Sequence, residues 1–127
     1  MVKKKVFKFK QNDVVDVTEM KTLDSNVIEC GRNRFTLHEF KAKGYENDTL
    51  QYAAVLYINN KPFFNCSKDE SGVTKIIAVD NKSGIFKKCV EAQLKKYKWS
   101  MMGHEYILTL EFIADNIANS YYKDGEL

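Results

Sequence analysis

The chain has 127 residues, a length typical of one domain, and we expect residues 1–127 to form a single unit. Its 20 basic and 17 acidic residues give a formal net charge of +3, and this sign excludes an acidic protein that imitates DNA. No apolar run approaches the roughly 20 residues of a membrane-spanning helix, and the charged N-terminus lacks the apolar core of a secretory signal. We therefore expect a cytoplasmic protein.

The first thirty residues predict short strands. Residues 2–10 alternate towards their end, which is typical of an edge strand or of a basic arm that becomes ordered on a partner. Residues 12–23 are compatible with a short helix capped by Asp13, but their β-branched residues favour a strand or a loop, which we prefer. Residues 27–30 predict another short strand.

The middle of the chain predicts antiparallel strands. Residues 34–43 form one strand, and a switch in the phase of its apolar residues indicates a β-bulge near His38 and Glu39. Residues 73–79 form the last strand of this series.

Between them lies the clearest pattern of the chain, a predicted hairpin. Residues 49–58 carry an apolar residue at every even position, the period of a strand with one buried face. A turn rich in Asn and Pro follows at residues 59–62, and residues 62–68 resume as a strand.

The C-terminal third predicts two helices. Residues 84–99 repeat apolar side chains near helical spacing, after Ser83, whose hydroxyl can cap the first turn. Residues 105–122 repeat them at i, i+3, i+4 and i+7, with His104 and Glu105 at the helix start and a break at residues 100–103. We therefore expect an α+β fold, with an antiparallel sheet of four to six strands and two C-terminal helices packed on one face.

Two groups of lysines indicate a binding function. One lies in residues 3–10 and the other in residues 82–98. Mobile cations beside aromatic rings suit phosphate binding, although the same lysines also suit a helix that they merely keep in solution. Arginine is limited to Arg32 and Arg34, so sequence-specific reading of DNA is not expected. The residues of the second group that we expect to bind are Lys87, Lys88, Lys95, Lys96, Lys98 and Trp99.

Aromatic residues of the predicted hairpin form a second set of binding candidates. Tyr57, Phe63 and Phe64 lie close together in the sequence, and a regular strand cannot direct two adjacent phenylalanines to one core. Either one of them is exposed and anchors an interface, or both faces of the sheet are covered.

The sequence contains none of the arrangements that catalysis requires. Cys30, Cys66 and Cys89 are far apart, and the only histidines are His38 and His104. This spacing favours neither a zinc site nor a Cys–His nucleophile pair, and no phosphate-binding or hydrolase motif is present. We therefore expect reduced thiols, no metal, no cofactor and no enzymatic activity.

Three segments carry a resemblance, YENDTL at residues 45–50, LYINNKP at residues 56–62 and SKDESG at residues 67–72. Together with the second predicted helix, they resemble a family of small proteins of bacterial phages and mobile elements, over residues 34–122. The resemblance implies strands and a hairpin followed by two helices. It also implies an origin in a mobile element, action in a bacterial host cell and no catalytic residues.

These features favour binding over catalysis. The most concrete hypothesis is an inhibitor of a host defence system that docks on a nucleic-acid-loaded effector, as anti-CRISPR proteins do. Its partner is then a host protein or ribonucleoprotein, with contact to the nucleic-acid backbone as a further expectation. One alternative is a sponge that sequesters a nucleotide immune signal. Another is an accessory protein that binds RNA or single-stranded DNA.

Overall fold

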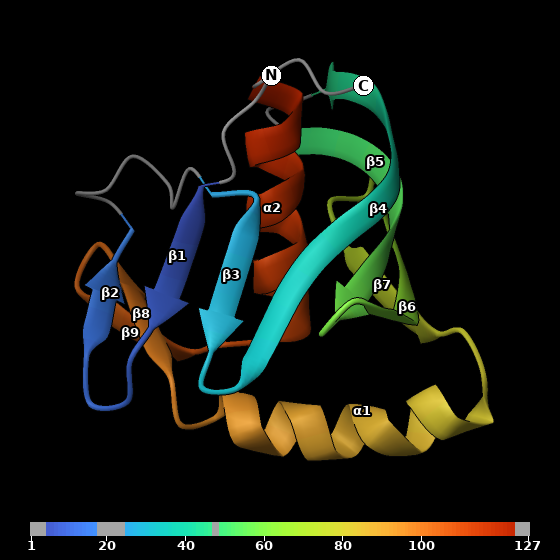
Figure 1. The fold of residues 1–127 in the computed structure, drawn as a ribbon. Helices are drawn as coiled ribbons and strands as arrows, with labels where there is room; N and C mark the ends of the chain where they lie inside the picture. Colours follow the sequence, from blue (N-terminus) through green and yellow to red (C-terminus); the bar gives the residue numbers. More distant parts are fainter. Residues whose placement is uncertain (1–4, 18–24, 47–48, 124–127) are drawn as a thin grey trace.

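The structure is a computed structural model that describes residues 5–17, 25–46 and 49–123. Within these residues the chain forms nine strands and two helices (Figure 1), which confirms the predicted α+β class with its two C-terminal helices. The strands are β1 (Val6–Phe9), β2 (Val14–Asp16), β3 (Val27–Cys30), β4 (Asn33–Glu46), β5 (Thr49–Ile58), β6 (Lys61–Lys68), β7 (Thr74–Ala78), β8 (Lys98–Met101) and β9 (His104–Ile107). The helices are α1 (Asn81–Leu94) and α2 (Leu110–Lys123).

Six strands form the main sheet, in the order β1-β3-β4-β5-β6-β7. The neighbours from β3 to β7 run antiparallel, as predicted, but β1 runs parallel to β3, with Val6 opposite Val27. The prediction of a purely antiparallel sheet is therefore wrong. A parallel pair needs a connection that returns the chain to its starting end, and the segment that contains β2 makes this connection.

The structure tests part of the predictions for residues 2–10 and 12–23. β1 is an edge strand, as expected, with Phe9 buried and Val6 exposed. Residues 14–16 of the ambiguous segment form β2, which supports the strand alternative there. Residues 18–23 of that segment, together with Lys3 and Lys4 of the first lysine group, lie outside the described residues.

The β5–β6 hairpin forms as predicted. Even-numbered residues of β5 face the core, and Leu56 and Ile58 are fully buried. Asn59 and Asn60 have φ values of 53° and 68°, the conformation of a two-residue type I′ turn that suits the twist of the strands. Ile58 pairs with Lys61, so β6 begins one residue earlier than the sequence indicates.

The predicted β-bulge is present in β4. The register with β5 shifts between His38 and Lys41, and Glu39 has a φ of 54°. The shift places Phe40 where its ring stacks on Tyr121 of α2, with 5.7 Å between the ring centroids. The bulge therefore changes which side chains of β4 face the core.

Helix α2 lies against one face of the main sheet, and β4 and β5 curve beside it (Figure 1). Its apolar repeat is buried as predicted, with Ile113 and Ile117 inaccessible to solvent. The helix begins at Leu110 rather than at residue 105, because the Thr109 hydroxyl accepts the Phe112 N–H at 3.2 Å and caps the first turn.

Helix α1 crosses the end of the main sheet (Figure 1). Both helices were expected on one sheet face, but only α2 lies there. The helix begins at Asn81, because the Asp80 carboxylate accepts the Ser83 N–H at 2.8 Å. The predicted cap, Ser83, is therefore a residue of the first turn.

The buried stripe of α1 is narrower than the sequence predicts. Val90 and Leu94 are fully buried, four residues apart. Ile85, Cys89 and Ala92, which were expected in the same stripe, are exposed. The helix meets the sheet only along one line, because it crosses the end of the strands and does not lie on their face.

A second sheet of three strands includes residues 98–99 and 105–107, which were predicted to be helical. Its order is β2-β8-β9, with β2 parallel to β8 and β8 antiparallel to β9. Met102 and Gly103 have φ values of 51° and 84° and form the two-residue turn between β8 and β9. The helix prediction failed here because the spacing of aromatic residues and lysines at residues 95–99 continues the helical pattern past Leu94. His104 and Glu105 consequently lie in β9 and do not start a helix.

Candidate binding cleft

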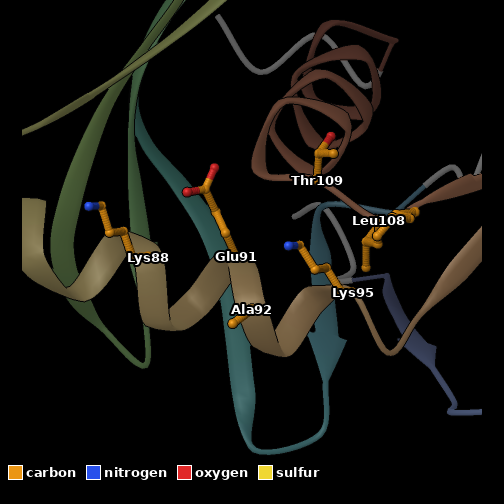
Figure 2. Close-up of a pocket in the computed structure, with 7 residues that line it drawn as sticks. Lys88, Glu91, Ala92, Lys95, Leu108 and Thr109 are labelled. Atoms are coloured by element: carbon orange, nitrogen blue, oxygen red, sulfur yellow. The ribbon is translucent and has the colours of Figure 1, made fainter.

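Helix α1 presents part of the predicted lysine group along one side. Lys88, Glu91 and Lys95 are three and four residues apart, so they follow one face of the helix. Ala92 belongs to the same face. In Figure 2 these side chains lie on the side of α1 that is turned towards the start of α2.

This face of α1 is one wall of a cleft of about 430 Å³. The opposite wall is the segment that joins β9 to α2, with Ile107, Leu108 and Thr109. We call this space the α1–α2 cleft. Its volume lies within the range of small-ligand sites, about 300–1,000 Å³.

Two amines dominate the charge of the α1–α2 cleft. The side-chain amines of Lys88 and Lys95 form no hydrogen bond or ion pair within the part of the chain that the structure describes. Glu91, the one acidic side chain of the lining, lies between them in the sequence. The lining therefore carries two positive charges and one negative charge.

The start of α2 adds a partial positive charge on the other side of the cleft. The first N–H groups of a helix lack partners within it and attract anions. The Thr109 hydroxyl satisfies one of them, that of Phe112, whereas Glu111 in the first turn opposes an incoming anion.

The lining of the α1–α2 cleft combines polar and apolar groups. Its polar groups are amines, one carboxylate and one hydroxyl that already accepts a hydrogen bond. Its floor is apolar, with Leu108 buried and Ile107 half exposed. Such a cleft suits an anionic group, a phosphate or a carboxylate, that is attached to an apolar body.

The other predicted lysines lie elsewhere. Lys87 is half-buried, and its Nζ donates to the Ile76 carbonyl oxygen of β7 at 3.2 Å, which holds α1 against the sheet edge. Lys96 lines a separate depression of about 370 Å³ beside the β3–β4 turn. Lys98 lies in β8, with Nζ 3.9 Å from the Glu105 carboxylate. Of the six predicted residues of this group, the α1–α2 cleft gathers only Lys88 and Lys95.

Trp99 has both ring faces covered. It stacks on Tyr106 of β9 at 4.5 Å and on Phe112 of α2 at 4.3 Å, measured between ring centroids. Its Nε1 is buried and has no hydrogen-bond partner in the described part of the chain. The outer ring of the stack is Tyr106, 41% exposed, which the sequence analysis missed because it placed residue 106 in a helix.

The two adjacent phenylalanines of β6 differ in how far they are covered. Phe64 is fully buried, and half-buried Phe63 stacks on Phe86 of α1 at 4.7 Å. Phe64 therefore lies in the core, whereas Phe63 points to the other side of β6, where Phe86 covers one face of its ring. The sheet face opposite α2 is not covered as a whole, so neither alternative holds in full. Tyr57 lies away from the cleft, beside His38, with 3.9 Å between the ring centroids.

The buried thiols are poor nucleophiles. Cys30 and Cys66 are buried, and burial raises the pKa of each to about 12. Both are therefore protonated at neutral pH and behave as small apolar side chains. Cys89 is exposed on α1.

Within the described residues, no group of three or more His, Cys, Asp or Glu side chains comes together in a way that could hold a metal ion. In the same part of the chain, neither helix combines the length and the apolar character needed to cross a membrane.

Comparisons with known proteins supply no assignment. No protein-family model, no curated protein and no solved structure matches the chain. The resemblance to proteins of phages and mobile elements therefore stays a prediction, and the function has to be inferred from the surfaces of the chain itself.

The sequence identified the α1 wall of the cleft but not the opposite wall. Ile107, Leu108 and Thr109 fall inside the predicted second helix and were assigned to its pattern. The available signal was the turn residue Gly103 followed by a capping threonine six residues later, which leaves room for a short strand.

Proposed function

We propose that this protein acts by binding and not by catalysis, and that the α1–α2 cleft engages an anionic group of a larger partner. The observation that carries the proposal is the pair of amines, Lys88 and Lys95, beside an apolar floor and without ion-pair partners in the described residues. Unpaired charge steers an oppositely charged partner towards a surface and fixes how it docks.

In its most concrete form, the partner is a host defence effector loaded with nucleic acid, which the protein inhibits in the manner of an anti-CRISPR protein. The resemblance to mobile-element proteins and the net charge of +3 support this form. Such an effector is a host protein or ribonucleoprotein, and it offers both acidic side chains and phosphates. The protein then acts in the cytoplasm of the bacterial host.

The test is capture of a partner by the tagged protein from lysates of candidate bacterial hosts. We expect the wild-type chain to recover one protein or ribonucleoprotein in stoichiometric amount. The double variant Lys88→Glu/Lys95→Glu should lose most of this capture and stay folded, because substitutions at exposed positions usually change stability by less than about 0.5 kcal/mol.

The matched control is Lys8→Glu/Lys10→Glu, which makes the same change in net charge at exposed residues of the N-terminal segment. This control should capture the partner as the wild type does. Equal loss in both double variants would show that net charge, and not the cleft, governs binding. Recovery of nothing from several hosts would contradict the proposal as a whole.

A further inference from the structure

The main sheet has a second face, opposite α2, whose side chains are exposed or half-buried. Cross-strand partners lie on the same face of a sheet, so the register defines rows of side chains across β4, β5, β6 and β7. One row consists of His38, Val55, Asn65 and Ile77, and the next consists of Lys41, Ala53, Ser67 and Lys75. We call this surface the outer face.

A bulge in β4 turns Lys41 to the outer face, and a second bulge affects Lys43. Residues an odd number of positions apart point to opposite sides of a regular strand, so Lys41 would face the core if His38 faces outward. The register shift between them reverses this, and Lys41 pairs with Ala53 on the outer face. A second shift, between Ala42 and Gly44, leaves Lys43 as the extra residue, and it is exposed.

Lys41 and Lys43 line a depression of about 370 Å³ in this part of the sheet. Ala53 is the small residue between the strands, and Ser67 adds a hydroxyl to the lining. Neither side-chain amine has a hydrogen bond or ion pair within the described residues. A compact anion such as a phosphate therefore finds two unpaired amines above a shallow floor.

One carboxylate also belongs to the lining. Asp69 lies at the end of β6, and its Oδ1 accepts the Ser71 N–H at 2.9 Å and the Ser71 hydroxyl. These bonds hold the Asp69 carboxylate within the turn that follows β6. Lys75, at the far end of the same row, adds a third positive charge to the outer face.

An aromatic pair occupies the neighbouring rows. The rings of His38 and Tyr57 are 3.9 Å apart between centroids and inclined by 37°. The Thr36 hydroxyl lies 3.2 Å from His38 Nε2 and fixes the imidazole on the strand. His38 is exposed and Tyr57 is half-buried, so the pair presents a ring surface to solvent beside half-buried Val55.

We infer that the outer face binds single-stranded nucleic acid, with a base on the His38–Tyr57 pair and a neighbouring phosphate between Lys41 and Lys43. A stacking platform flanked by amines suits an unpaired strand, because its bases expose the ring faces that a duplex hides. An acidic protein would use the lysines but not the ring pair. The scarcity of arginine agrees with contacts to ring faces and phosphates in place of base edges. This site is separate from the α1–α2 cleft and does not depend on the function proposed for it.

The test is fluorescence anisotropy of a labelled short oligouridine, with an oligothymidine of equal length and a DNA duplex for comparison. Both single strands should bind at low salt and the duplex should bind more weakly. One neutralised phosphate on a single strand predicts a slope of about −0.7 for log affinity against log salt. His38→Ala removes the exposed ring and should weaken binding roughly 5- to 150-fold, the range for loss of one stacked base.

Lys41→Glu/Lys43→Glu should weaken binding at least about tenfold, since two cations become anions beside the phosphate. The matched control is Lys8→Glu/Lys10→Glu, which changes the net charge equally at exposed residues outside both proposed sites. It should bind oligouridine nearly as the wild type does at moderate salt. Circular dichroism confirms that each variant is folded.

The inference fails if the wild type does not bind oligouridine at low salt, if both double variants lose binding equally, or if the duplex binds more tightly. If Lys88→Glu/Lys95→Glu loses capture of a partner from lysates but keeps oligouridine binding, only the α1–α2 cleft is affected. Different variants therefore test the two proposals.

Discussion

A single carboxylate, Asp115, connects α2 to three strands of the main sheet. It accepts the Tyr52 hydroxyl of β5 at 2.8 Å and the Thr74 hydroxyl of β7 at 2.9 Å, and its Oδ2 lies 3.3 Å from Lys68 Nζ of β6. Burial and the adjacent carboxylate raise the pKa of Tyr52, so this hydroxyl stays protonated and donates at neutral pH. Partly buried polar groups of this kind are stabilising only while each has its partners.

Replacement of Asp115 should therefore destabilise the fold. Asp115→Asn removes the ion pair with Lys68 and reduces the acceptors available to Tyr52 and Thr74, and we expect the free energy of unfolding to fall by about 1–3 kcal/mol. Tyr52→Phe removes only one hydroxyl and should lower it by about 0.5–1.5 kcal/mol. Urea unfolding of both variants and of the double variant measures the coupling. Fully additive losses would contradict a shared network.

The thiols provide a second prediction at the scale of the residue. Because burial raises the pKa of Cys30 and Cys66 to about 12, only Cys89 should react with iodoacetamide in the native protein at mildly alkaline pH. Mass spectrometry should show one adduct in the native state and three after unfolding. Native Cys89→Ser should show none, and rapid labelling of Cys30 or Cys66 in the native state would contradict the burial described here.

At the scale of the element, the sequence predicted the structures that depend on neighbouring residues. It did not predict which strands pair when they lie far apart in the chain. The β5–β6 hairpin follows from alternation and a turn that Asn59 and Asn60 accept, and the bulge follows from the phase switch at His38. All of this information lies within a few residues. The parallel pairing of β1 with β3 depends on how a long connection returns, which no local pattern specifies.

The ends of the helices show how a capping residue outweighs periodicity. Asp80 and Thr109 set where α1 and α2 begin, by accepting the N–H groups of Ser83 and Phe112. The sequence analysis chose Ser83 as the cap of the first helix and began the second helix at residue 105, where apolar spacing already continues. It therefore assigned residues 98–99 and 105–107 to the helices, although they belong to β8 and β9.

The cap of α1 should make its stability depend on pH. The hydrogen bond from the Ser83 backbone N–H lowers the pKa of Asp80 below its usual value. A carboxyl whose pKa is lower in the folded state stabilises the fold above the unfolded value, about 3.9, and this stabilisation is lost as the pH falls through the folded pKa. Asp80→Ala should lower the melting temperature at neutral pH, and the difference from the wild type should shrink in acid.

Asp80→Asn separates the hydrogen bond from the charge. Asparagine keeps a capping oxygen but does not titrate, so this variant should retain most of the stability at neutral pH and lack the acid-dependent part. Melting curves by circular dichroism across the acidic range measure both effects. If the melting temperatures of the wild type and Asp80→Ala differ by the same amount at every pH, the charge of the carboxylate does not contribute to stability.

At the scale of the whole molecule, the sequence indicated which residue types bind but not how they are grouped. The lysines of α1 are divided among the α1–α2 cleft, the edge of β7 and a depression near β3. Lys41 and Lys43 reach the outer face only because the bulge between His38 and Lys41 changes the phase of β4. Neither grouping can be predicted until the strands have been paired and the helices positioned.

The N-terminal segment and α2 join the two sheets into one structure. β1 belongs to the main sheet and β2 to the small one. The ring of Phe9 in β1 lies 6.5 Å from that of Phe112 in α2, and Phe112 stacks on Trp99 of β8. This continuous line of aromatic contacts should couple the unfolding of the small sheet to that of the main sheet.

Phe9→Ala tests that coupling. Phe9 is 1% exposed, and its replacement by alanine should lower the free energy of unfolding by about 3–5 kcal/mol. The control is Val6→Ala on the same strand. Val6 is 49% exposed, so this change should alter the free energy of unfolding by less than about 0.5 kcal/mol.

Trp99 is the only tryptophan, so its fluorescence reports on the small sheet while far-ultraviolet circular dichroism reports on the whole chain. The two unfolding transitions should coincide in the wild type and shift together in Phe9→Ala, because α2 packs on both sheets. A fluorescence transition that precedes the other would show that the small sheet opens independently and that the aromatic line does not transmit stability between the sheets.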